Sequence, residues 1–330
     1  MKLTLEQVKK ITFGAIDVIE TDLGFALKRF TDKQADYYAI YREEGYKLKC
    51  NSAAGIRLHF LTDSKKFALD YAVRVDECPT GGMARFDLYI DGVLCENFGI
   101  IEGDADKHFE YELGDGVKNV ELYLPWTKMV YLSNITLDDG ASFAPVKRSR
   151  TMLAYGDSIT HGYFAYHPSL SYASKLARAL DADQYNKAIG GDRFFPELLE
   201  LEEPVKPDII TVAYGTNDWS RHTRATVQKR SRAFLAVLRA KFPTAKMFVI
   251  TPIWRDRENE PKFMKKFNGY VHEVKAIIEE NCKDLANVTV IDGMKLVPHD
   301  QHFFGDGLHP NDLGMCIYAD NLYLEIEKHL

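Results

Sequence analysis

The sequence has no long hydrophobic run, and this absence excludes the simplest membrane architectures. No apolar stretch approaches the ~20 residues that a membrane-spanning helix needs. The N-terminal segment, "MKLTLEQVKKITFGAIDVIE", also lacks the apolar core and the small-residue cleavage site of a secretory signal peptide. We therefore expect no membrane partner and a cytoplasmic location.

Cysteine is scarce and scattered. The chain contains five cysteines and no CxxC pair: Cys50, Cys78, Cys95, Cys282 and Cys316. Their odd number and wide spacing indicate neither a zinc site nor a disulfide framework. We interpret them as buried free thiols, which again favours a reducing, cytoplasmic setting.

Positive charge is not in excess either. The chain carries 42 basic and 48 acidic residues, a net charge of −6. A nucleic-acid-binding protein usually presents a concentrated basic surface, and this composition gives no sign of one. We therefore expect no nucleic-acid partner.

Up to about residue 147, apolar residues recur at every second position. In "FALDYAVRV" the apolar side alternates through Phe67, Leu69 and Tyr71, and "RFDLYIDGVLC" turns at Asp91-Gly92, a dipeptide suited to a tight hairpin. Many short strands joined by turns predict an antiparallel β-sandwich of the jelly-roll type over residues 1–147. The length of 330 residues allows a second domain with its own core.

After "FAPVKRSR" the pattern changes to short apolar runs that alternate with helical stretches. The five runs cover residues 151–156, 183–189, 208–215, 246–253 and 287–293. Such alternation predicts βαβ units, and hence a doubly wound, flavodoxin-like sheet of five parallel strands with helices on both faces over residues 148–330. Sheets of this kind bind ligands at the carboxyl ends of their strands.

Four polar stretches stand at these strand ends or before the last helix. They read "YGDSIT", "AIGGDR", "YGTND" and "DGLHPN". Each alone can be explained structurally: Ser158 as a helix N-cap, the others as turns or loop-stabilising residues. All four in this order, at one edge of one sheet, favour a shared functional site.

These stretches resemble the four blocks of the SGNH, or GDSL-type, hydrolase family. The resemblance covers about residues 151–330 and assigns the family's residues to Ser158, Gly191, Asn217 and His309, with Asp306 beside the histidine. In "AIGGDR", Gly190 competes with Gly191 for the second block. The phrase "FDLYIDG" in the first half is similar to the accessory domain that precedes some SGNH carbohydrate esterases.

The resemblance implies a serine esterase, and the residues suit that chemistry. Ser158 needs a base, for which His309 is the best candidate, and Asp306 three residues earlier can orient the imidazole. His161 is a competing base, but it lies on the first helical turn after the serine. The backbone N–H groups of Ser158 and Gly191 and the amide of Asn217 would form the oxyanion hole.

Aromatic residues after the strand ends are candidates for stacking on a sugar ring. They are Tyr163, Trp219 and Trp254, and core packing explains them equally well. The chemistry requires no cofactor and no metal ion.

We therefore predict a short-chain esterase whose substrate is a small ester, with O-acetyl groups on oligosaccharides favoured. Two alternatives stay open: a broad-range lysophospholipase- or thioesterase-like GDSL hydrolase, and an inactive carbohydrate-binding protein. The sequence does not decide whether the sandwich binds sugar, shapes the active-site cleft or mediates self-association.

Overall fold

The computed structural model describes residues 1–256 and 261–330, which group into two compact units. The first unit holds Met1–Ser149 together with Tyr166–Ser169, and the second holds Arg150–Ala165 with Leu170–Leu330. The main division thus falls after Ser149, close to the boundary that the change in periodicity predicts.

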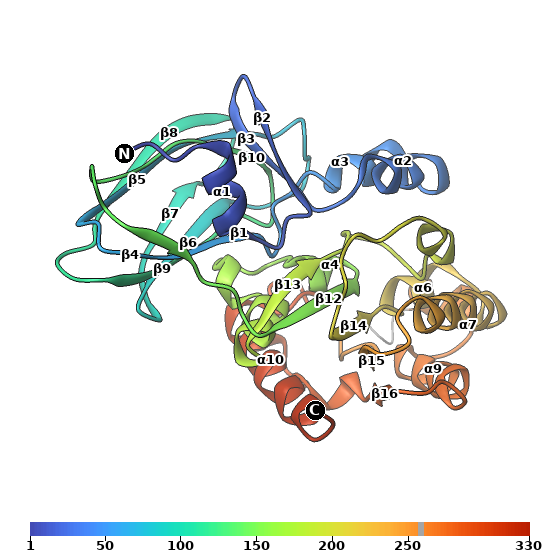
Figure 1. Cartoon of the computed structure of the whole chain (residues 1–330). Coiled ribbons are helices and arrows are strands. Elements are labelled where there is room, and N and C mark those ends of the chain that lie inside the picture. Colours follow the sequence, from blue (N-terminus) through green and yellow to red (C-terminus); the bar gives the residue numbers. More distant parts are fainter. Residues whose placement is uncertain (257–260) are drawn as a thin grey trace. The chain divides into compact units, whose positions relative to one another are not determined.

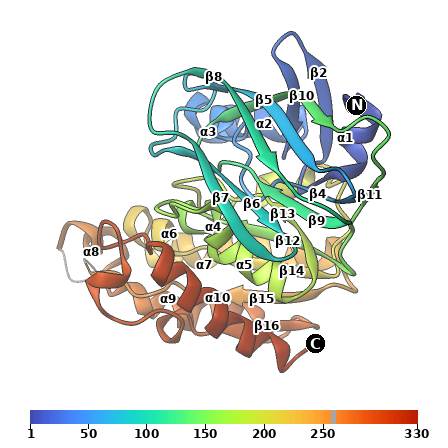
Figure 2. The same ribbon diagram turned by 90° about the vertical axis from the view of Figure 1, so that its left-hand side faces the viewer.

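Two antiparallel sheets form the first unit (Figures 1 and 2). The first sheet has the order β1 (Thr12–Phe13), β4 (Arg57–Thr62), β9 (Lys118–Tyr123), β6 (Ala84–Ile90) and β7 (Val93–Ile100), with β11 (Phe143–Pro145) beside β4. The second has the order β2 (Asp17–Thr21), β3 (Gly24–Lys28), β10 (Met129–Leu137), β5 (Lys66–Arg74) and β8 (Ala105–Glu112).

The core of this unit lies between the two sheets. Phe60 and Leu88 come from one sheet and Phe67 and Leu132 from the other, and all four are fully buried in one apolar cluster. The predicted hairpin at Asp91-Gly92 joins β6 to β7, and both turn residues have positive φ, as a type I′ turn requires. The two antiparallel sheets with one shared core therefore agree with the sandwich predicted from the alternation of apolar residues.

Three helices accompany the sheets of the first unit: α1 (Leu5–Ile11), α2 (Asp32–Tyr41) and α3 (Glu44–Lys49). Thr4 and Thr31 each begin a helix with a reciprocal capping box, in which a glutamine three residues later bonds back to the cap. The strand pattern of this half does not predict these helices.

The short segment Tyr166–Ser169 differs from the predicted domain range 148–330, because it groups with the first unit. The carboxylate of Asp87, buried on β6, accepts hydrogen bonds from Nδ1 of His167 (2.8 Å) and from the backbone N–H of Ser169 (2.9 Å). The hydroxyls of Tyr89 and Ser169 lie 3.0 Å apart. These bonds tie the segment to the sandwich.

The second unit is built on five parallel strands, and this confirms the predicted doubly wound fold. Their order is β13 (Ala182–Asn186), β12 (Arg150–Gly156), β14 (Ile209–Ala213), β15 (Lys246–Ile250) and β16 (Val288–Ile291). Numbered along the chain within this sheet, the order is 2-1-3-4-5, the flavodoxin-like arrangement.

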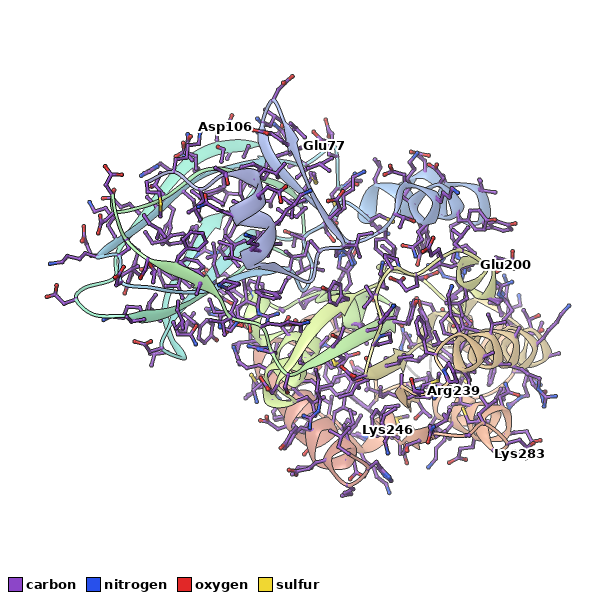
Figure 3. The ribbon with its side chains drawn as sticks, in the orientation of Figure 1. Glu77, Asp106, Glu200, Arg239, Lys246 and Lys283 are labelled. Atoms are coloured by element: carbon purple, nitrogen blue, oxygen red, sulfur yellow. The ribbon has the colours of Figure 1, made fainter. Side chains whose placement is uncertain are left out.

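Helices cover both faces of this sheet, with α10 (Asp312–Glu327) on one side and α7 (Arg224–Lys241) and α9 (Val274–Cys282) on the other (Figure 1). Helix α5 (Tyr172–Ala179) packs against α10, and their rings Tyr172 and Tyr318 stack at 4.1 Å. Charged side chains such as Glu200 and Lys283 lie on the exposed outside of this unit (Figure 3). The side chain of Asn311 caps α10 by accepting the N–H of Gly314 (3.1 Å).

Residues 261–282 do not form one continuous helix. They form α8 (Pro261–Phe267), a 3₁₀ turn at Val271–Glu273 and α9, with Asn268 at positive φ in the break. The break exposes the Gly269 carbonyl, which accepts a hydrogen bond from the indole N–H of Trp219 (2.8 Å). A tertiary contact therefore competes with helix continuity at this point.

The five cysteines are free thiols as predicted, but not all of them are buried. Cys50, Cys78 and Cys282 are buried, whereas Cys95 is exposed and Cys316 is half-buried. Among the described residues, no helix is both long enough and apolar enough to cross a membrane.

Candidate active site

The nucleophile candidate lies on a sharp turn at the carboxyl end of the central strand β12. That strand ends at Gly156, and Ser158 begins the one-turn helix α4 (Ser158–His161). The Asp157 carboxylate caps this helix by accepting the N–H of Ile159 (3.1 Å). The helix cap is therefore Asp157, and the Ser158 hydroxyl is available for other contacts.

Asp306 and His309 are joined by local hydrogen bonds in the loop before α10. Oδ2 of Asp306 lies 2.9 Å from Nδ1 of His309, and Oδ1 accepts the backbone N–H groups of Leu308 (3.0 Å) and His309 (2.8 Å). One carboxylate oxygen thus shapes the loop while the other orients the imidazole. The spacing of three residues is what makes both bonds possible.

The fold brings Ser158 and His309 together although 151 residues separate them. Nε2 of His309 lies 2.7 Å from Oγ of Ser158. The three side chains therefore form one hydrogen-bonded series, with the imidazole between a hydroxyl and a carboxylate. A serine placed in this way can lose its proton to the ring as it attacks a carbonyl carbon.

The Asp306 carboxylate is held in its ionised form. Partial burial by itself would raise its pKa, but the hydrogen bonds from the side chain and backbone of His309 lower that pKa to about 2. A permanently charged acceptor keeps the Nδ1 proton of His309 in place and favours the imidazolium that forms during proton transfer.

Two further carboxylates near the site behave in the opposite way. Burial raises the pKa of Asp157 to about 6, against the lowering effects of the Ile159 N–H and of His309. Burial likewise raises the pKa of Asp218 to about 7, although the Phe194 N–H lowers it. Within the described parts of the chain, neither carboxylate forms an ion pair. The buried surroundings of Asp157 and Asp218 therefore disfavour their ionised forms.

The side chain of Asn217, predicted as the third oxyanion donor, is buried at its amide nitrogen. Asn217 lies in the first turn of α6 (Thr216–Arg221), directly after strand β14. Its side-chain Nδ2 is buried and has no hydrogen-bond partner among the residues that the structure describes. A buried amide donor without an acceptor is costly, and it suits a group that meets its acceptor only when substrate arrives.

The glycine pair of the second block is resolved in part. The backbone N–H of Gly190 donates to Nδ1 of His161 (3.1 Å), so it is already committed. Gly191 has φ of +85°, a conformation that favours glycine. Of the two glycines, Gly191 therefore remains the candidate donor.

Of the three predicted stacking residues, Trp219 does not fit that role. Its side chain is 0 % exposed, its N–H is bonded to Gly269, and the guanidinium of Arg255 lies 5.2 Å from the ring centroid. It is a core residue, so no sugar can reach its faces. Trp254 is half-buried and stacks on His299 at 5.6 Å.

Tyr163 does lie at the site, and it has a neighbour that the sequence analysis missed. The rings of Tyr163 and Phe164 stack on the His309 ring, with centroids 5.4 and 5.6 Å away. Phe164 is exposed and has a positive φ of 68°, which is unusual for an aromatic residue. Its position directly after the GDS block was the only available signal.

Across residues 1–256 and 261–330, no three His, Cys, Asp or Glu side chains gather in a way that could hold a metal ion.

This geometry agrees with the sequence family that the chain matches. Residues 154–316 match the GDSL-like Lipase/Acylhydrolase family, a range that includes Ser158, Asn217, Asp306 and His309. The second unit is thus a GDSL-like lipase/acylhydrolase domain, and the predicted family resemblance is confirmed. A comparison with curated proteins finds no match.

Several solved structures share the architecture of the whole chain. A salicylyl-acyltransferase, SsfX3, from a tetracycline biosynthetic pathway is 23 % identical, with a TM-score of 0.81 and coverage of 96 % of this chain and 94 % of that one. A protein from Bacteroides ovatus described as GDSL-like lipase is 21 % identical, with a TM-score of 0.79 and coverage of 100 % and 97 %.

An acetyl xylan esterase, Est2A, from the rumen bacterium Butyrivibrio proteoclasticus is 16 % identical. Its TM-score is 0.65, and the match covers 99 % of this chain and 98 % of that one. The combination of both units therefore recurs in other solved structures.

Proposed function

We propose that this chain is a serine esterase that hydrolyses short-chain esters, with O-acetyl groups on oligosaccharides as its substrates. The observation that carries the proposal is the continuous hydrogen-bonded series from Ser158 through His309 to Asp306. Serine, imidazole and carboxylate in this order are the parts that acyl transfer through a covalent intermediate requires.

In the first half-reaction, Nε2 of His309 takes the proton of the Ser158 hydroxyl while Oγ attacks the ester carbonyl. The C–O bond to the alcohol then breaks, and the alcohol leaves with the proton from His309. In the second half, water attacks the acyl-enzyme by the same proton route and releases the carboxylic acid and Ser158. Asp306 stays ionised throughout and stabilises the imidazolium of His309.

The oxyanion formed in each half needs donors that already point at it. In this proposal they are the backbone N–H groups of Ser158 and Gly191 and Nδ2 of Asn217. Each such donor contributes roughly 3–4 kcal/mol to the transition state. The unpartnered, buried state of the Asn217 amide supports its role.

Two observations support a sugar-bearing acetyl ester. The acetyl xylan esterase from Butyrivibrio proteoclasticus matches the chain over nearly its full length. Beside His309, the exposed ring of Phe164 and the half-buried ring of Tyr163 offer flat apolar faces on which a sugar ring can stack.

A panel of substrates tests the proposal. We expect the full-length protein to hydrolyse p-nitrophenyl acetate faster than the octanoate and palmitate esters, and to release acetate from acetylated xylo-oligosaccharides. A Ser158→Ala variant should lose this activity and should no longer react with a fluorophosphonate probe. A similar melting temperature for both proteins would show that the variant is folded.

The alternatives give different outcomes in the same panel. A rate maximum at octanoate or longer chains would favour a lysophospholipase- or thioesterase-like enzyme and overturn the acetylesterase. Binding of oligosaccharides without hydrolysis of any ester, and without probe labelling, would favour an inactive carbohydrate-binding protein.

A further inference from the structure

We propose that His161 is a positioning residue of the oxyanion hole: its imidazole accepts the N–H of Gly190 and so fixes the loop that carries Gly191. This inference rests on the proposed esterase function and adds a second histidine with a role distinct from that of His309.

The location of His161 links the two loops that the reaction must align. His161 ends α4, the same turn that begins with Ser158, and its backbone N–H donates to Asp157 (2.9 Å). Its side chain is 1 % exposed and reaches the loop after β13, where it meets Gly190. This hydrogen bond therefore connects the turn that carries Ser158 to the loop that carries Gly191.

The direction of this bond fixes the state of the ring. Gly190 can only donate through its N–H, so Nδ1 of His161 must be unprotonated and the neutral ring must carry its proton on Nε2. A ring in this state has no proton to give at Nδ1. His161 therefore acts by holding Gly190 in place, whereas His309 acts on the hydroxyl of Ser158.

The neighbouring amides of the same loop are also tied to protein acceptors. The N–H of Ile189 donates to the Gly156 carbonyl (3.3 Å), and that of Asp192 donates to the Ile189 carbonyl (3.0 Å). With Gly190 held by His161, the backbone on both sides of Gly191 is fixed. A preorganised donor is more effective than one that must reorient during the reaction.

Tyr163 couples this arrangement to the catalytic base candidate. A Cβ at Gly190 would collide with the Tyr163 ring and hydroxyl, so glycine is required there for close packing. The Tyr163 ring meets His161 edge-on at 5.6 Å and stacks on His309 at 5.4 Å. The volume around Gly190 is thus filled, and a displaced loop would have to move Tyr163 as well.

A matched pair of substitutions separates the acceptor from the ring. In His161→Asn the amide oxygen can take the place of Nδ1, whereas His161→Leu has the same shape without an acceptor. Both substitutions remove the imidazole and with it the ring contact with Tyr163. We expect His161→Asn to keep kcat on p-nitrophenyl acetate within about threefold, and His161→Leu to lower kcat by about 10- to 100-fold with little change in KM.

Two readouts keep the result interpretable. Melting temperatures show whether each variant is folded, and amide hydrogen exchange reports the bond itself, since the Gly190 N–H should be protected in the wild type and in His161→Asn but not in His161→Leu. In the wild type, the ¹⁵N shifts of His161 should show an unprotonated Nδ1.

Equal losses of kcat in the two variants would overturn the inference, as would a His161→Leu variant with wild-type kcat or a protonated Nδ1 in the wild type. A wild-type protein without any ester hydrolysis would instead overturn the proposed function itself, and the role of His161 with it.

Discussion

Two Asp–His pairs lie close together in the loop before α10, and they look alike at first. In the pair Asp300–His302, Oδ1 of the aspartate accepts the backbone N–H of the histidine (2.9 Å) and lies 2.7 Å from its Nδ1. In the pair Asp306–His309, the corresponding distances are 2.8 and 2.9 Å. Both aspartates therefore fix their own histidine.

The pairs differ in what the far side of the imidazole meets. The side chain of His302 is 84 % exposed, whereas that of His309 is 12 % exposed and its Nε2 lies 2.7 Å from Ser158. Asp306 also divides its two oxygens between the loop and the ring, whereas Asp300 uses one oxygen for both. An Asp–His pair is thus a common local structure, and the serine makes one of them an active-site candidate.

The largest expected effect comes from replacing each histidine by glutamine. His309→Gln removes the base from Ser158, and we expect kcat on acetate esters to fall by about 10⁴- to 10⁶-fold. His302→Gln is the matched control and should leave kcat unchanged. Steady-state kinetics and melting temperatures of the two variants check this difference. Comparable losses of kcat in both variants would contradict the assignment of His309, rather than His302, as the base for Ser158.

A smaller effect is expected from replacing each aspartate by asparagine. Asp306→Asn leaves a neutral amide that can donate to Nδ1 and favour the wrong tautomer of His309, so kcat should fall by about 10³- to 10⁴-fold. Asp300→Asn provides the control and should retain full kcat. An Asp306→Asn enzyme with near-wild-type kcat would show that the carboxylate is needed only for the loop.

The smallest effect concerns stability as a function of pH. The folded pKa of Asp306, about 2, lies below that of an unfolded aspartate, so its ionised form stabilises the fold above about pH 4 and this contribution is lost as the pH falls toward 2. Asp306→Asn should therefore lower the melting temperature by a few degrees near neutral pH, and the difference should shrink in acid.

The pKa of the exposed Asp300 is also lowered, by the backbone and side chain of His302. Because solvent screens such a surface pair, Asp300→Asn should change the melting temperature by no more than about 1 °C. Thermal melts of both variants over an acid-to-neutral series measure the contrast. A pH-independent difference for Asp306→Asn would contradict the assigned ionisation.

The sequence predicted the parts of this molecule that depend on periodicity and chain order. Apolar residues at every second position predicted the sandwich, and the alternation of strands and helices predicted the five-stranded parallel sheet. Because the carboxyl ends of parallel strands share one edge, Ser158 and Asn217 had to lie near each other once β12 and β14 were assigned.

What the sequence could not predict depends on contacts between distant segments. Trp219 follows a strand end like a binding residue, but its burial is decided by Gly269 and Arg255, which come from elsewhere in the chain. The choice between Gly190 and Gly191 likewise depends on a ring nitrogen of His161. Residue type and spacing carry no record of such partners.

The tetrapeptide Tyr166–Ser169 has a consequence for anyone who would recombine these modules. A gene fusion cut cleanly at Ser149 would carry a short piece of the sandwich along with the hydrolase, and would leave the buried Asp87 without His167 and the Ser169 amide. A working domain exchange therefore has to move residues Tyr166–Ser169 together with the sandwich residues that bond them, Asp87 among them.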